Sequence, residues 1–239
     1  MLITGAGGGL GVHLAADLLS RGERELIFHC RNRRDALLSV LKDHELDPER
    51  HVVYGDLTQE DDVRAIHERT RALHGPLFGL VNLAGGSSNG MSWKLSLDEF
   101  RQVLDANLVT TFLCCREFAP EMRECGRGRI VNVSSVVATA GAPGTSHYSA
   151  AKAAILGFTR TLALELAPKN VVVSAVALGY FQYGLIDSIP PAQQEAIRSR
   201  IPAGRFGAAA ELAGLLQFLL GESGAYSGGQ LYPINGGMI

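Results

Sequence analysis

The sequence predicts a single α/β domain in which a seven-stranded parallel sheet carries helices on both faces. Short apolar segments alternate with longer amphipathic ones, which is the pattern of parallel strands joined by covering helices. A glycine-rich turn follows the first apolar segment, and a length of 239 residues suits one large α/β unit. No linker, repeat or low-complexity stretch divides the chain, so residues 1–239 are expected to form one domain.

The expected strands are short and apolar. They cover residues 2–4, 26–30, 51–55, 77–83, 129–134, 171–176 and 230–234. The first is short for a central strand, which favours further residues ahead of Met1 in the complete protein.

Helices are expected between these strands. They run from the glycine-rich turn to residue 21, and over residues 34–44, 58–74, 96–124 and 148–166. Thr58 with Asp61 resembles a capping box, and Ser96 with Glu99 forms one, so each pair predicts a helix start. Gly22 and Gly75 follow the first and third helices as stop signals.

Two irregular segments, residues 85–94 and 178–205, interrupt this alternation. Long loops in a compact domain are usually functional. Both follow strands at the edge where open α/β sheets bind ligands, so residues 178–205 are expected to form the substrate loop.

Composition excludes several classes of protein. A net charge of −2 gives no reason to expect nucleic acid or an anionic membrane as partner. The chain has neither a signal-peptide start nor an apolar run of about 18 residues. Scattered histidines argue against a metal site. The cysteines lack CxxC spacing, so we expect reduced thiols in a cytoplasmic protein, with Cys114 and Cys115 in the core.

The glycine-rich turn joins the first strand to the first helix with the sequence Thr4-Gly5-Ala6-Gly7-Gly8-Gly9-Leu10-Gly11. Glycines there let the backbone bring a helix N-terminus against a pyrophosphate, which predicts a Rossmann fold. A turn without a ligand is the alternative.

The residues after the second strand bear on the choice of cofactor. An acidic residue about 20 positions after the turn would hold an adenosine ribose, but this chain has Arg31-Asn32-Arg33-Arg34 there. A guanidinium suits a 2′-phosphate, so NADPH is expected over NADH, with Arg31 as its main contact. At least one of Arg33 and Arg34 is expected in a solvated basic turn.

Tyr148 and Lys152 lie at i and i+4, on one face of an expected helix. A phenol has a pKa of about 10, and a nearby ammonium lowers it towards the range useful in acid–base catalysis. Ser135 ends the preceding strand and could orient a carbonyl, whereas Ser134 is assigned to backbone capping. A surface Tyr–Lys pair is the alternative, but the pair opens a helix on the cofactor side of the sheet.

Together these features resemble the short-chain dehydrogenase/reductase superfamily in order and spacing, over essentially the whole chain. The motifs are the glycine-rich turn, Asp56-Leu57, Asn82-Leu83-Ala84-Gly85, Asn107, Ser135 and Tyr148-x-x-x-Lys152. The chain looks most like the 3-oxoacyl-[acyl-carrier-protein] reductases, through Ile201-Pro202-Ala203-Gly204-Arg205-Phe206-Gly207 and Ile234-Asn235-Gly236-Gly237-Met238.

The resemblance implies roles for the matching residues. Tyr148 would protonate the carbonyl oxygen while a nicotinamide delivers hydride. Lys152 would hold the nicotinamide ribose and lower the Tyr148 pKa, and Ser135 would orient the substrate. Asn107, in mid-helix, would hold a water that relays protons to Lys152. The implied cofactor contacts are Thr4, Gly5, Gly8, Gly9, Leu10, Arg31, Asn32, Asp56, Leu57, Asn82, Ala84, Gly85, Tyr148, Lys152 and Gly179.

The chain departs from the family pattern at Leu83, Leu178 and Tyr183, where a second Asn, a Pro and a Thr are usual. Leu83 is expected to be harmless, because the backbone makes the contact. The other two weaken the link to a particular substrate. Trp93 and Met91 are expected either to line an entrance or to pack. A relay role for His147 is rejected, because adjacent helical residues point about 100° apart.

Two expectations concern partners. The helix over residues 148–166 is apolar on nearly every side, which predicts a second covering helix and a homo-oligomer, either dimer or tetramer. A reductase serving acidic acyl-carrier protein needs basic residues at its mouth. Arg123, Arg127 and Arg129 are the candidates, and a solvated turn is the alternative.

Three hypotheses of function follow. The first is a reductase of 3-oxoacyl thioesters bound to acyl-carrier protein or CoA. The second is a reductase or dehydrogenase of another small ketone, sugar or polyketide alcohol. The third is a non-catalytic NADP-binding subunit, which the set Ser135, Tyr148 and Lys152 disfavours.

Overall fold

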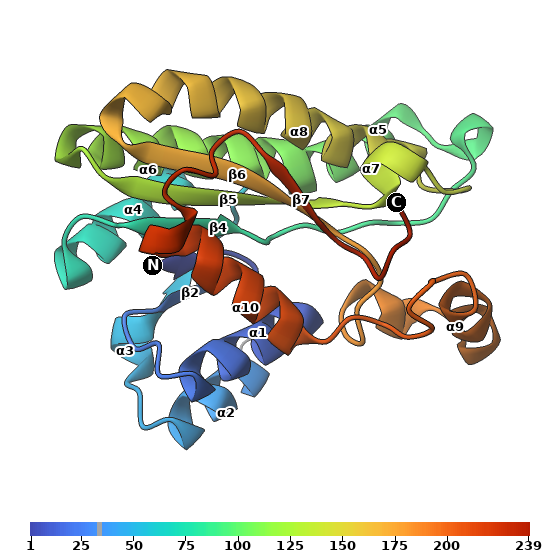
Figure 1. The fold of residues 1–239 in the computed structure, drawn as a ribbon, viewed down its shortest axis with the longest axis horizontal. Helices are drawn as coiled ribbons and strands as arrows, with labels where there is room; N and C mark the ends of the chain where they lie inside the picture. Colours follow the sequence, from blue (N-terminus) through green and yellow to red (C-terminus); the bar gives the residue numbers. More distant parts are fainter. Residues whose placement is uncertain (33–34) are drawn as a thin grey trace.

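A computed structural model describes residues 1–32 and 35–239 of the chain. Arg33 and Arg34, expected in part in a solvated turn, lie outside the described residues. The chain forms one α/β domain of the Rossmann type with a seven-stranded parallel sheet, as the sequence predicts (Figure 1).

The sheet has the order β3-β2-β1-β4-β5-β6-β7, and every neighbouring pair is parallel. The strands are β1 (Leu2–Ile3), β2 (Ile27–Cys30), β3 (Val52–Tyr54), β4 (Gly79–Asn82), β5 (Gly128–Ser135), β6 (Val171–Leu178) and β7 (Leu231–Ile234). The order reverses between β1 and β4. Ligands of open parallel sheets bind at such a point, beyond the carboxyl ends of the strands.

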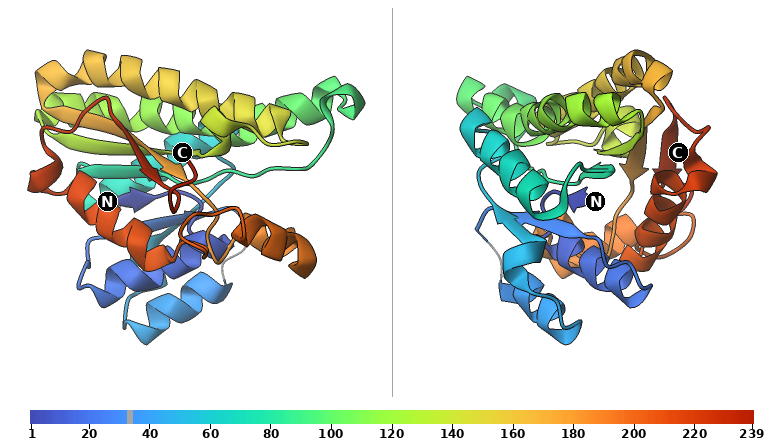
Figure 2. Two further views of the ribbon diagram at one scale, coloured as in Figure 1. Left: turned by 45° about the vertical axis from the view of Figure 1, so that its right-hand side comes forward. Right: turned by 90° about the vertical axis from the view of Figure 1, so that its left-hand side faces the viewer.

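Helices cover both faces of the sheet (Figure 2). The α-helices are α1 (Gly9–Ser20), α2 (Asp35–Asp43), α3 (Pro48–His51), α4 (Glu60–His74), α5 (Leu97–Leu104), α6 (Thr110–Cys125), α7 (Val137–Ala140), α8 (Ser146–Leu166), α9 (Pro191–Arg198) and α10 (Ala209–Leu220). Single turns of 3₁₀ helix are η1 (Ser92–Lys94), η3 (Ala167–Lys169), η4 (Leu185–Ser188) and η5 (Glu222–Gly224), and a π turn, η2 (Asp105–Val109), joins α5 to α6.

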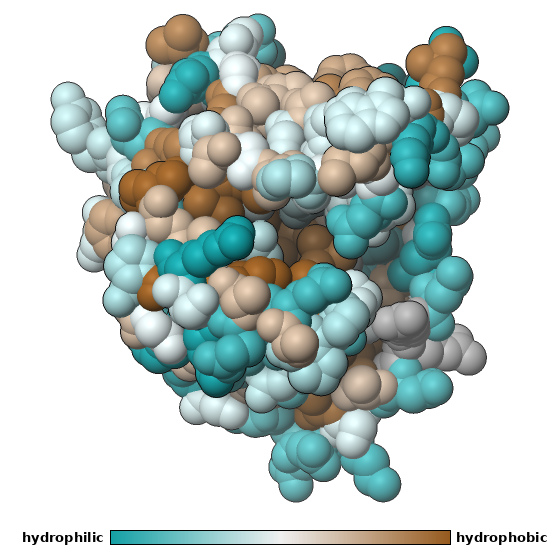
Figure 3. Space-filling model, turned by 90° about the vertical axis from the view of Figure 1, so that its right-hand side faces the viewer, coloured by the Kyte–Doolittle hydropathy of each residue, from teal (hydrophilic) through white to brown (hydrophobic). Residues whose placement is uncertain are grey.

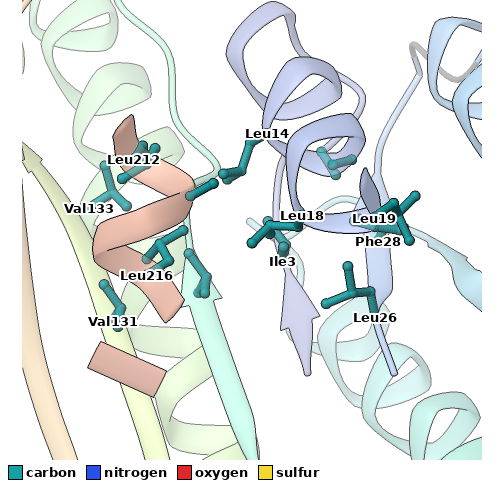
Figure 4. Close-up of a cluster of buried hydrophobic side chains, with 14 of the residues drawn as sticks. Ile3, Leu14, Leu18, Leu19, Leu26, Phe28, Val131, Val133, Leu212 and Leu216 are labelled. Carbon is teal, nitrogen blue, oxygen red and sulfur yellow. The ribbon is translucent and has the colours of Figure 1, made fainter. Parts of the chain in front are cut away.

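Strands β1 to β6 send alternate side chains to two separate cores. Ile3, Phe28 and Val131 pack with α1, α2 and α10 on one face (Figure 4). Their neighbours Leu2 and Ile27 pack with α4, α6 and α8 on the other. Because strands buried on both faces are mostly apolar, they lack the polar alternation of a one-sided sheet.

Several boundaries differ from the prediction. β5 and β6 are longer, because they pair residue by residue from Gly128↔Val171 to Ser135↔Leu178. The long helix expected over residues 96–124 is divided by the π turn at Asp105–Val109. Helices α3, α7, α9 and α10 were not predicted. In the part of the chain described, no helix is both long enough and apolar enough to cross a membrane.

The predicted capping box of Thr58 and Asp61 is wrong. Gln59 is the residue before α4, and its side chain makes no capping bond. Thr58 instead donates from its backbone and hydroxyl to Asp56 Oδ1, at 3.0 and 2.8 Å. An Asp side chain readily bonds the backbone two residues on, and this turn fixes the end of β3.

Candidate active site

The candidate site lies beyond the carboxyl ends of β1, β4, β5 and β6. Figure 3 shows this side of the molecule as a hollowed face, with hydrophobic side chains deep in the hollow and hydrophilic ones around it. Two cavities open here, of about 390 and about 1060 Å³. Gly5, Gly8, Leu83 and Gly85 line both, so the two cavities are adjacent.

The glycine-rich turn is fixed to β4. Thr4 Oγ1 accepts a hydrogen bond from the Ala84 N–H at 3.0 Å. Gly5 has φ +70°, and a Cβ there would lie 2.7 Å from Ala84 Cα. Only glycine suits this conformation and this approach. The turn leads into α1, whose first residues Gly9, Leu10 and Gly11 line the larger cavity, and a helix N-terminus at a cavity suits an anion.

The smaller cavity brings together most of the predicted adenosine-side residues. The predicted residues that line it are Gly5, Gly8, Arg31, Asn32, Asp56, Leu57, Ala84 and Gly85. Cys30 also lines it. Thr4 and Asn82 are buried and do not line the cavity; of the two, Thr4 supports the turn through its bond with Ala84.

His29 is a supporting residue that the sequence analysis missed. It is buried in β2; its Nδ1 accepts from Gly5 N–H at 3.2 Å, and its Nε2 lies 3.0 Å from Gly55 O. These contacts assign the proton to Nε2. Burial lowers the pKa of His29, which keeps it in this neutral form. A histidine in an apolar strand gave no sequence signal for that role.

Arg31 and Asp56 form an ion pair at the wall of the smaller cavity, with Arg31 Nη1 3.2 Å from Asp56 Oδ2. The Arg31 side chain is 60% exposed, so most of its guanidinium can meet a ligand. Although burial opposes it, hydrogen bonds from Thr58 and the charge of Arg31 lower the pKa of Asp56. The carboxylate is thereby held ionised beside the guanidinium.

The larger cavity gathers the predicted catalytic side chains. Ser135, Tyr148 and Lys152 all line it, together with Gly9, Leu10 and Gly179. Lys152 Nζ donates to Val133 O at 2.9 Å and lies 5.6 Å from the centre of the Tyr148 ring. Ser134, predicted to cap backbone, donates to Lys152 O at 2.8 Å. It thereby fixes α8 to β5.

The pKa of Tyr148 moves in the direction opposite to that predicted. Burial raises the pKa of Tyr148 to about 12, against the lowering effect of a hydrogen bond with Ser135. Burial also lowers the pKa of Lys152 to about 8. At neutral pH Tyr148 is therefore an uncharged phenol, the form that donates a proton.

Asn107 lines neither cavity but lies directly behind them, fully buried in the π turn. Its Nδ2 donates to Gly86 O at 2.7 Å and to Val103 O at 2.8 Å, while its Oδ1 has no partner among the described residues. A Cβ on Gly85 would lie 2.4 Å from that oxygen and 3.3 Å from Lys152 Nζ. Asn107 Oδ1 and Lys152 Nζ therefore both lie close to Gly85. π turns recur at functional sites.

A buried polar network supports this arrangement. Asn82 Nδ2 donates to Asn132 Oδ1 at 2.8 Å, and Asn132 Nδ2 donates to Thr159 Oγ1 at 2.9 Å. Asn82 also contacts Cys115 Sγ at 3.3 Å. The network joins β4, β5, α6 and α8, which together carry the candidate site. Cys114 and Cys115 are core residues, as predicted.

The segment after β6 crosses in front of the glycine-rich turn. The Tyr183 ring stacks on His13 of α1, with centroids 3.5 Å apart and planes at 16°. A Cβ on Gly9 would lie only 2.7 Å from Gly184 N. Asp187 accepts from Gly184 N–H at 2.9 Å. Tyr183 therefore fastens this loop to α1.

Some predicted residues lie elsewhere. The mouth position expected for Arg123, Arg127 and Arg129 is wrong, because they precede or begin β5 whereas the site lies at its far end, roughly 23 Å away at about 3.3 Å per residue. Arg127 and Arg129 lie over Phe78 instead.

Loop residues gave mixed outcomes. Met91 lines the larger cavity, whereas Trp93 does not line it and is 79% exposed. His147, for which the sequence analysis rejects a relay role, is fully buried in α8.

Comparison with known proteins agrees with this geometry. A family model described as short chain dehydrogenase matches residues 1–194. The chain is 34% identical over 237 residues to nodulation protein G of Rhizobium sp. (strain N33), which covers 99% of this chain and 95% of that protein. It is 34% identical over 237 residues to 2-dehydro-3-deoxy-L-rhamnonate dehydrogenase (NAD(+)) of Sphingomonas sp. (strain SKA58), covering 99% and 93%. The 3-oxoacyl-[acyl-carrier-protein] reductase FabG of Aquifex aeolicus (strain VF5) is 34% identical over 238 residues, covering 100% and 96%.

Proposed function

Because the chain belongs to the short-chain dehydrogenase family, we propose that it reduces a ketone to a secondary alcohol with NADPH, and that Tyr148 is the general acid. The observation that carries the proposal is the convergence of Ser135, Tyr148 and Lys152 on one wall of the larger cavity. The family uses a nicotinamide dinucleotide for interconversion of alcohols and carbonyls.

The residues present fit such a cofactor. Gly5, Gly8 and Gly9 would receive the pyrophosphate at the N-terminus of α1, and Asp56 and Leu57 would flank the adenine. Asn107 Oδ1 is buried without a protein partner, as expected of a group that holds a water behind the nicotinamide ribose. When bound, the cofactor supplies the hydride.

The side chains supply the proton and the orientation. Ser135 donates to the ketone oxygen and holds it beside Tyr148. Tyr148 is protonated at neutral pH because burial raises its pKa, so it gives its proton as negative charge develops on that oxygen. Lys152 stabilises the resulting phenolate by its charge. Asn107 and its water return a proton towards Lys152.

The preference for NADPH rests on Arg31. A guanidinium at the rim of the smaller cavity suits a 2′-phosphate by charge and geometry. Asp56 holds Arg31 from one side at 3.2 Å, which orders the guanidinium before a ligand arrives.

The lining of the larger cavity favours an uncharged substrate. Among its lining side chains in the described chain, only Lys152 and Asp187 carry charge. Lys152 is committed to the reaction, and Asp187 would repel an anion. Apolar groups such as Val137, Pro143 and Ile189 make up much of the wall. A 3-oxoacyl thioester fits this lining, whereas a free oxo acid finds no cation.

We therefore base the proposed substrate on the 3-oxoacyl-[acyl-carrier-protein] reductase relative. The rhamnonate dehydrogenase relative, which is named for an acid, fits this lining less well. Acyl-carrier protein or CoA would carry the thioester, and another small uncharged ketone remains the second candidate. A cytoplasmic location is proposed because the four cysteines lack CxxC spacing. Association into a dimer or tetramer is proposed from the apolar faces of α6 and α8.

A substrate panel tests the proposal. NADPH oxidation is measured with the acetoacetyl thioester of N-acetylcysteamine and with acetoacetate. We expect kcat/KM for the thioester to exceed that for the acid at least tenfold, roughly 1.4 kcal/mol. Tyr148→Phe should lower turnover ~10²–10⁴-fold while NADPH still binds. Tyr226→Phe, at a fully exposed tyrosine, is the matched control. Cofactor binding without turnover of any ketone would indicate a non-catalytic subunit.

A further inference from the structure

His147 is a fully buried imidazole next to Tyr148, and the proposed chemistry does not use it. It occupies the second position of α8. Its Nε2 lies 3.1 Å from Ser88 Oγ, and its Nδ1 has no partner among the described residues. An unpaired buried nitrogen destabilises folding. A fully buried position is better filled by an apolar side chain, unless the other ring nitrogen, Nε2, makes a contact that the protein needs.

The partner of His147 belongs to the segment between β4 and η1, which forms part of the larger cavity. Ser87 and Asn89 line that cavity, whereas Ser88 between them does not. Ser88 instead turns its hydroxyl towards α8. The Ser88–His147 contact therefore fixes which side chains of this segment face a substrate.

Two other contacts hold the same segment. Asn107 Nδ2 donates to Gly86 O at 2.7 Å, and Gly90 N–H donates to Gly144 O at 3.0 Å. In both contacts the atom that belongs to the segment is a backbone atom, and the two contacts lie on either side of Ser88. The Ser88–His147 contact is the side-chain link at the centre of the segment, and it joins the segment to the helix of Tyr148.

We propose that His147 is a positioning residue that, through Ser88, holds the 85–91 segment in register with α8 so that Ser87 and Asn89 face the ketone. The proposal rests on the proposed function, since it assigns a substrate-facing role to this segment. His147 itself touches neither substrate nor cofactor. Its loss should weaken ketone binding and leave proton transfer from Tyr148 largely intact.

Kinetics of single and double variants test the proposal. Ser88→Ala and His147→Met should each raise KM for the ketone about two- to tenfold, the range of one net hydrogen bond, with kcat and the Kd for NADPH within twofold of wild type. The double variant should resemble either single one, because both remove the same contact. Ser92→Ala, an exposed serine of η1, is the matched control.

Conservative variants separate positioning from packing. Ser88→Thr keeps the hydroxyl and His147→Gln keeps a polar group near the Nε2 position, so both should retain a near-normal KM. An unchanged KM in Ser88→Ala, additive effects in the double variant, or loss of kcat instead of KM each overturn the proposal. If His147→Met does not fold, the comparison of Ser88→Ala with Ser88→Thr alone tests the proposal.

A measurement without a substrate distinguishes this proposal from the proposed function. Hydrogen exchange of the amides in residues 85–91 should be faster in Ser88→Ala than in wild type, and unchanged in Ser92→Ala. Faster exchange with no ketone turnover would support the contact and refute the function. Unchanged exchange in Ser88→Ala overturns the positioning role.

Discussion

Burial governs the two ionisable groups of the candidate centre in opposite senses. It raises the pKa of Tyr148 to about 12 and lowers that of Lys152 to about 8. Each group is thus moved towards its neutral form. The sequence indicated the pair and its spacing but not this direction, because an i, i+4 relation says nothing of the apolar walls around it.

The lysine carries a stability consequence. Between pH 8 and 10.5 the unfolded chain binds more protons at Lys152 than the folded chain, because the folded pKa is depressed. Raising the pH through this window should therefore stabilise the wild type relative to Lys152→Met, by on the order of 3 kcal/mol. Urea unfolding at pH 7 and pH 10.5 measures the change. Lys169→Met, at an exposed lysine, is the control, and an equal pH dependence there contradicts the assignment.

Arg31 sets the expected cofactor preference. NADPH should bind at least tenfold more tightly than NADH, about 1.4 kcal/mol. Arg31→Ala should remove most of this difference and leave NADH binding little changed, because only the 2′-phosphate needs the guanidinium. Fluorescence titration of both cofactors gives the ratio. Equal affinities in the wild type would refute the preference.

At the scale of elements, the sequence was most informative where a local rule acts alone. The capping box of Ser96 and Glu99 is present as predicted, because its partners are three residues apart. The π turn around Asn107 was missed, since it depends on how α5 and α6 meet α8. Thr58 also gave a misleading signal, because Asp56 competes for its hydrogen bonds.

The loop after β6 shows the same limit. Tyr183 departs from the family pattern, and only the structure shows that it stacks on His13. We expect His13→Ala or Tyr183→Ala to increase hydrogen exchange at Gly184 and Asp187 about two- to twelvefold, since an aromatic pair contributes about 0.5–1.5 kcal/mol. Tyr183→Phe keeps the ring and should match the wild type. Faster exchange in that variant would assign the effect to the hydroxyl instead.

At the scale of the molecule, the fold class, the sheet and the grouping of the predicted residues could be read from the chain. Apolar strands, the glycine-rich turn and the order of motifs are all local or sequential signals. The placement of Arg123, Arg127 and Arg129 was misjudged, because the predicted strand over residues 129–134 already puts them at its amino end, away from the carboxyl ends where ligands bind. How copies of the chain associate depends on which side chains the folded surface exposes.

The exposed faces of α6 and α8 point to association. Leu164 is 78% exposed and Phe112 42%, and Phe112 meets Phe158 edge-on at 6.0 Å. Covering this face in a homo-oligomer would remove apolar area from water. Leu164→Glu should shift the mass seen by light scattering towards the monomer. A wild type that is already monomeric at micromolar concentration contradicts the prediction.

The rate of cysteine modification should report whether a ligand occupies the smaller cavity. Cys125 is exposed, whereas Cys114 and Cys115 are buried in the core, where burial raises the pKa of the Cys114 thiol to about 12. Thiolates are the reactive form, so alkylating reagents should modify Cys125 and spare that pair. Cys30 is buried at the wall of the smaller cavity. Its slow modification, followed by mass spectrometry, should be slower still when a dinucleotide covers it.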